Sequence, residues 1–124
     1  MKLATIIVRS LLGLLFLFAS ITFFFRLITP PPQVGAMKVF SDGLASSIYL
    51  LPTVKVIELL CGVAFLSGRY VALATVLIAP IIVNILLIHV FLDPKGLPLA
   101  LFLVLANAFL AYAHRDRFRP LFKA

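Results

Sequence analysis

The chain has 124 residues, of which 64% are hydrophobic and only 12% are Asp, Glu, Lys or Arg, and its mean hydropathy is +1.22. A water-exposed surface needs a larger share of charged side chains, so this composition excludes a soluble enzyme, a disordered tail and a disulfide-rich secreted domain. In such an apolar chain the net charge of +7 indicates anchoring at the cytoplasmic face of a membrane and contact with anionic lipid, not nucleic-acid binding.

Four apolar stretches are predicted as membrane-spanning helices, because a helix needs about 20 apolar residues to cross roughly 30 Å of hydrocarbon. They cover residues 3–28, 50–67, 70–92 and 97–113. The first begins as a signal peptide does, but it continues through Phe23–Phe25 without a small-residue cleavage site, which favours a retained span. The lengths, and the lack of alternating polar positions, favour helices over the strands of a barrel.

The connections predict an all-α integral membrane protein, a four-helix up-down bundle in one domain over residues 1–124. Residues 67–69 and 93–96 form short polar turns, which make consecutive helices antiparallel. The tail, residues 114–124, mixes basic and aromatic side chains as an anchor at the lipid head groups does.

The connection between the first two spans is longer and contains a further helix. Pro30–Pro32 cannot continue the first helix, because proline lacks the N–H donor and fixes φ. After this run, apolar residues recur at intervals of three and four, at Met37, Phe40, Leu44, Ile48 and Leu51. This spacing predicts an interfacial or re-entrant helix over residues 36–48.

The distribution of basic residues predicts the orientation of the bundle. Four spans bring both termini to one side of the membrane, together with seven of the eleven basic residues: Lys2, Arg9, Arg69, Arg115, Arg117, Arg119 and Lys123. Because cytoplasmic loops are enriched in Lys and Arg, both termini are predicted to lie in the cytoplasm.

Polar residues of the second and third spans are predicted to lie at matching depths near the outer face. Lys55 and Glu58 lie about 5 and 9 Å from that face, and His89 and Asn84 about 5 and 12 Å. A charged side chain inside a span costs about 2.5–3.5 kcal/mol, so it should face the bundle interior and have a partner. These four residues are the candidates for binding a ligand or carrying a proton.

Each candidate also has a purely structural interpretation. Lys55 and Glu58, three residues apart, form either a local ion pair only, or the polar wall of an outward-facing pocket with Glu58 as hydrogen-bond acceptor or proton carrier. Asn84 either satisfies backbone groups beside a kink at Pro80 or binds the ligand. Three residues are expected to support the site: Arg26 at the end of the first span, Pro80 at the kink, and Gly62, which permits close helix approach.

Catalytic and metal-binding constellations are absent from the sequence. His89 and His114 fall on opposite sides of the membrane, so no haem or zinc site is expected within one chain. The single cysteine, Cys61, excludes a CxxC pair and is interpreted as a packing residue, and Phe23–Phe25 as a lipid contact. Because no nucleophile with a base or cofactor motif is present, autonomous catalysis ranks last among the functions.

The order of short motifs resembles the DoxX family, in particular its DoxX-like branch, of small bacterial four-helix membrane proteins. These motifs are Arg9–Leu17, Lys55–Gly62, Ala79–Leu86 followed by His89, Asp93-Pro94, Gly96–Pro98 and Arg117–Leu121. The resemblance covers nearly the whole chain and implies the bacterial inner membrane. It also implies that Lys55, Glu58, Asn84 and His89 are the site residues.

The resemblance implies a small membrane subunit of a redox-linked complex, with a pocket for a quinone-like or other lipophilic ligand and no covalent cofactor. The alternatives are an assembly factor or structural subunit of a larger membrane protein, and a binder of lipid or sterol-like ligands. The expected partners are the lipid bilayer and a larger membrane or redox complex, with no nucleic acid. The sequence leaves open whether the chain also forms a homo-oligomer.

Overall fold

The computed structural model describes residues 2–26 and 33–122, which are mostly helical, with no β-strand among them. The elements are α1 (Lys2–Phe25), α2 (Gly35–Ser46), α3 (Leu50–Ser67), α4 (Val71–Phe91), η1 (Pro94–Gly96), α5 (Leu97–Ala113), η2 (Arg115–Arg117) and η3 (Arg119–Phe122). Within the described ranges, four helices are long and apolar enough to cross a membrane, namely α1, α3, α4, and α5 together with η1. The expected all-α class is therefore confirmed, and the four long apolar helices are compatible with a membrane bundle.

The predicted ranges 50–67 and 97–113 coincide with α3 and α5, whereas the first span differs. It was expected to reach residue 28, but α1 ends at Phe25 because Arg26 has a φ of +53°, a left-handed conformation that a helix cannot continue through. Residues 27–28 and the predicted Pro30–Pro32 stop lie outside the described residues, as do the last two residues of the tail.

A helix, α2, is present where the interfacial helix was expected over residues 36–48, and it ends at Ser46. Ile48, placed by its spacing on the apolar face of that helix, has a φ of +72° and is exposed. The residue therefore belongs to the link between α2 and α3. Met37, Phe40 and Leu44 are the half-buried apolar residues of α2, as expected from their common helical face.

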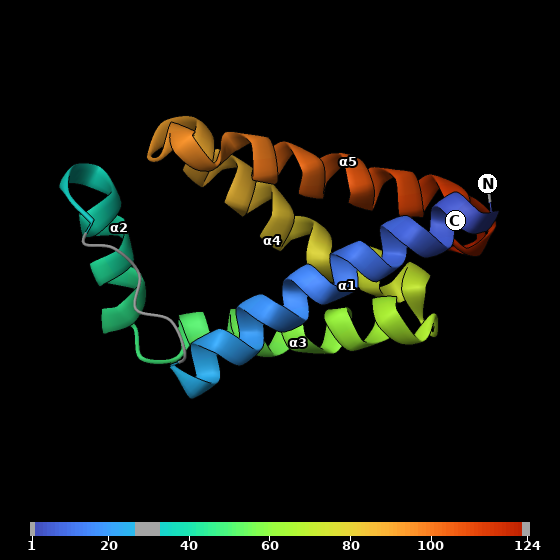
Figure 1. The fold of residues 1–124 in the computed structure, drawn as a ribbon, viewed down its shortest axis with the longest axis horizontal. Helices are drawn as coiled ribbons and strands as arrows, with labels where there is room; N and C mark the ends of the chain where they lie inside the picture. Colours follow the sequence, from blue (N-terminus) through green and yellow to red (C-terminus); the bar gives the residue numbers. More distant parts are fainter. Residues whose placement is uncertain (1, 27–32, 123–124) are drawn as a thin grey trace.

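The four long helices form a closed ring, in which α1 and α4 each pack against both α3 and α5. Figure 1 shows the ribbons close together where α1 begins and α5 ends, while the α1–α3 pair diverges from the α4–α5 pair toward the other end. The core of the ring is apolar and includes Leu12, Phe65, Ile78 and Leu110. The amphipathic α2 lies beyond the diverging end, against α3.

Asn107 and Cys61 make polar contacts between neighbouring helices in the converging half of the ring. The Asn107 Nδ2 of α5 donates a hydrogen bond of 3.2 Å to the Thr75 carbonyl of α4, and the Cys61 Sγ of α3 lies 3.7 Å from the Ala74 carbonyl. Asn107 and Cys61 are both buried. They fix the relative rotation of α3, α4 and α5, because polar atoms buried in an apolar core must meet a partner.

Candidate functional site

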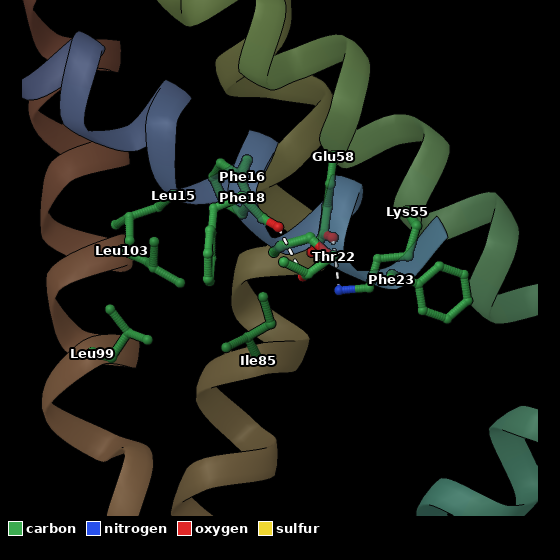
Figure 2. A pocket seen from close by; sticks show the side chains of 11 residues that line it. Leu15, Phe16, Phe18, Thr22, Phe23, Lys55, Glu58, Ile85, Leu99 and Leu103 are labelled. Atoms are coloured by element: carbon green, nitrogen blue, oxygen red, sulfur yellow. Dashed lines mark hydrogen bonds and ion pairs between the residues drawn. The ribbon is translucent and has the colours of Figure 1, made fainter. Parts of the chain in front are cut away.

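A cavity of about 600 Å³ lies between the long helices in their diverging half. Its lining comes from all four helices: Leu15, Phe16, Phe18, Ala19, Thr22 and Phe23 of α1, Lys55 and Glu58 of α3, Ile85 of α4, and Leu99 and Leu103 of α5. Figure 2 shows Glu58 and Lys55 beside Thr22 and Phe23, with Leu99 and Leu103 across from them. The cavity is thus apolar except along the wall formed by α3 and the end of α1.

The polar wall contains a buried ion pair between Lys55 and Glu58. The Lys55 Nζ lies 3.0 Å from the Glu58 Oε2, and the two side chains are 20% and 5% exposed. The Phe23 ring lies 5.9 Å from the same ammonium nitrogen, close enough for a cation–π contact. A separation of three residues puts both charged groups on one helix face, so the pair forms within α3 alone.

The Glu58 carboxylate retains an unused capacity to accept hydrogen bonds. The 3.0 Å contact with Lys55 is an ion pair, and the Glu58 Oε2 accepts no hydrogen bond from the described residues. The nearby Thr22 hydroxyl donates to the Phe18 carbonyl, at 2.8 Å. Because a buried carboxylate oxygen is costly without a donor, this wall favours a ligand that carries one.

Of the four candidates from sequence, Lys55 and Glu58 line the cavity and the two α4 residues do not. Asn84 is exposed on the outer side of α4. The reason is geometric: Ile85 faces the cavity, and a helix turns about 100° per residue, so the preceding side chain points well away from it. The expected convergence at matching depth is therefore limited to the α3 pair.

His89 has a structural place at the turn that follows α4. Its Nδ1 lies 2.9 Å from the Asp93 carbonyl, and a Cβ on Gly96 would strike the imidazole ring. Since a carbonyl oxygen only accepts, the proton is on Nδ1 in this contact. The ring thus fixes the turn between α4 and α5 and lies outside the cavity lining.

The three residues expected to support the site lie at separate places. Arg26 is exposed directly after α1, and Pro80 is exposed within α4. Gly62 is buried against α1, where a Cβ would lie 3.0 Å from the Leu17 Cγ. Gly62 therefore sets the close approach of α1 to α3, one turn beyond Glu58.

Phe23 belongs to the site although sequence reasoning treated the whole Phe23–Phe25 run as a lipid contact. Phe24 and Phe25 are 42% and 71% exposed, as expected for lipid-facing side chains, but Phe23 lines the cavity. The spacing contains the relevant signal, because Phe23 follows the buried Phe16 by seven residues and so shares its helix face.

No group of three or more His, Cys, Asp or Glu side chains within residues 2–26 and 33–122 is arranged to hold a metal ion. Comparisons with protein-family models, with characterised proteins and with solved structures find no match for this chain. The candidate site is accordingly defined by its geometry: a buried ion pair in the wall of an apolar cavity between membrane-length helices.

Proposed function

We propose that this chain is a DoxX-like, non-catalytic membrane subunit of a redox-linked complex, and that its cavity takes the head group of a quinone-like lipophilic ligand. The observation that carries the proposal is the buried Lys55–Glu58 pair in the wall of a largely apolar cavity of about 600 Å³. Ligand sites are commonly lined by apolar side chains with a few polar groups, at volumes of roughly 300–1,000 Å³.

The chemistry of the pair matches both redox states of a quinone. The carbonyl oxygens of an oxidised quinone accept hydrogen bonds, which the Lys55 ammonium donates. The hydroxyl groups of a hydroquinone donate hydrogen bonds, which the Glu58 carboxylate accepts through an oxygen that has no such partner among the described residues. The apolar walls from α1 and α5 suit the ring and the start of an isoprenoid-like tail.

In this proposal the helices form an up-down bundle in the bacterial inner membrane, with both termini cytoplasmic and α2 interfacial at the outer surface. Support comes from the start of α1 and the end of α5, which lie together at the converging end with most of the basic residues. The cavity then opens in the outer half of the bundle.

The test is the binding of a soluble-tailed quinone analogue to the full chain in lipid nanodiscs. Glu58→Gln keeps the shape of the side chain but removes the charged acceptor, and we expect it to weaken binding by about tenfold, the value of one charge-assisted hydrogen bond. Asp42→Asn is the matched control, since it makes the same chemical change in the exposed Lys38–Asp42 pair of α2.

Equal binding by the wild type and Glu58→Gln, or binding by neither, contradicts the quinone proposal. If a membrane protein also co-purifies with this chain in a fixed ratio, the assembly-factor function replaces it. Loss of binding in Glu58→Gln alone, with Asp42→Asn unchanged, supports the ligand-binding function.

A further inference from the structure

A second concave region lies at the converging end of the bundle, away from the Lys55–Glu58 cavity. A hollow of about 460 Å³ is formed where α1 begins, α3 turns into α4, and α5 ends. A smaller hollow of about 180 Å³ adjoins it and shares three of its lining residues. We call the two together the basic pocket, defined by Lys2, Arg9, Gly68, Val71, His114 and Arg117.

The basic pocket has an uncompensated positive charge. None of the four acidic residues of the chain lines it, and the nearest along the chain, Asp116, pairs with Arg119 at 3.3 Å. The side chains of Lys2 and Arg117 make no hydrogen bond or ion pair with another residue of the described ranges. Several like charges around one hollow repel each other, so an anion bound there lowers their mutual repulsion.

The guanidinium of Arg9 is held in place at the floor of the basic pocket. Its Nη1 donates to the Phe65 and Leu66 carbonyls at the end of α3, at 2.7 and 3.0 Å. The group lies against Gly68, where a Cβ would come 2.9 Å from the same nitrogen. These contacts use one nitrogen and fix the plane of the group, so the remaining N–H donors are oriented before any ligand binds.

The first turn of α4 borders the smaller hollow and adds to the positive field. Val71, Ala72 and Leu73 line it, and α4 begins there without a side-chain cap. The first N–H groups of a helix have no partner within the helix, and the N-terminus of a helix as long as α4 carries a partial positive charge. The preformed donors of α4 therefore reinforce the cationic side chains of the pocket.

We propose that the basic pocket binds a phosphate group, supplied either by the head group of an anionic phospholipid or by a free phosphate compound. A phosphate oxygen accepts hydrogen bonds from guanidinium, ammonium and helix N–H groups alike. The pocket lies at the end of membrane-length helices, where lipid phosphates are found, and apolar side chains such as Ile6 lie beside it for an acyl chain.

The experiment measures ligand binding to the full chain after delipidation in a neutral detergent. The probes are a short-chain phosphatidic acid, a diacylglycerol with the same chains, and inorganic phosphate. The test variant is Lys2→Gln/Arg117→Gln, which removes two charges of the basic pocket whose side chains make no hydrogen bond or ion pair with the described residues. The control, Arg69→Gln/Arg115→Gln, removes two charges from the same end that do not line the pocket and that pair with no acidic side chain of the described residues.

We expect the wild type and the control to bind phosphatidic acid alike, and the test variant to bind it at least about tenfold more weakly. Displacement of the lipid by inorganic phosphate identifies a site for the free anion, and its absence identifies a lipid site. Equal weakening in both double variants shows a bulk charge effect and overturns the proposal, as does diacylglycerol binding as tightly as phosphatidic acid.

Discussion

Gly13 of α1 and Gly62 of α3 lie directly against each other, and each occupies the space that a side chain on the other would need. A Cβ on Gly13 would lie 2.9 Å from the Gly62 carbonyl oxygen, and a Cβ on Gly62 would lie 3.1 Å from the Gly13 carbonyl oxygen. The two helices therefore approach to backbone contact at this point. The contact lies between Arg9 and Glu58 along the bundle, one turn from each.

Replacement of either glycine by alanine is expected to separate α1 from α3. Gly13→Ala should lower the free energy of unfolding by about 1–3 kcal/mol, and Gly62→Ala by less, because the added methyl group on Gly13 meets closer atoms. Unfolding in mixed micelles measures the change. The control is Gly43→Ala in α2, because a Cβ on Gly43 would have open space around it. If Gly43→Ala lost as much stability as Gly13→Ala, the packing argument would be contradicted.

Removing one partner of the cavity ion pair is expected to destabilise the fold strongly, whereas replacing both charges is expected to destabilise it little. Lys55→Met leaves the buried Glu58 unpaired, which should lower the free energy of unfolding by about 3–5 kcal/mol. Lys55→Met/Glu58→Gln removes the uncompensated charge and should recover most of this loss. Chemical unfolding of both variants gives the comparison, and a double variant that is no more stable than Lys55→Met shows that the pair is not electrostatically coupled.

Arg9 is expected to stabilise the contact between α1 and the end of α3. Arg9→Gln removes two charge-assisted hydrogen bonds to carbonyl groups and should lower the free energy of unfolding by about 1.5–3 kcal/mol. Arg69→Gln, a change of the same kind on the neighbouring exposed turn, should have no measurable effect. Similar thermal unfolding midpoints for the two variants would rule out this role of Arg9.

Binding of the quinone analogue is expected to depend on the cavity lining and not on the outer side of α4. Leu99→Trp places a larger side chain at the cavity and should weaken binding by about tenfold, roughly 1.4 kcal/mol. Asn84→Leu should leave binding unchanged, because Asn84 does not line the cavity. Titration of both variants in nanodiscs measures their affinity for the quinone analogue. Weaker binding by Asn84→Leu would show that the outer side of α4 contributes to the site.

The sequence predicts where a residue lies along its helix better than it predicts which way the side chain faces. Position along a helix follows from counting residues at a known rise, and Lys55 and Glu58, three residues apart on α3, line the same cavity. The direction in which a side chain points depends on how the helix is rotated about its axis. The sequence of α4 is apolar on all sides, so no pattern marks the inner side, and the outward position of Asn84 required the packed structure.

Helix ends were predictable where a local signal marks them. Gly68, with a φ of +77°, ends α3 at the expected position, because glycine adopts the left-handed conformation readily. Arg26 and Ile48 adopt the same conformation without being glycine, so the ends of α1 and α2 carry no such signal. At these two helix ends the predicted boundaries differ most from those in the structure.

The single cysteine can report on the separation of α3 from α4. The thiol of Cys61 is 2% exposed where α3 meets α4, and alkylation requires the reagent to reach the sulfur. The native protein should therefore take up a maleimide only as fast as these two helices separate. A second cysteine placed at an exposed site such as Ser46 would be labelled first, so fluorophores and spin labels can be attached there without replacing the native residue.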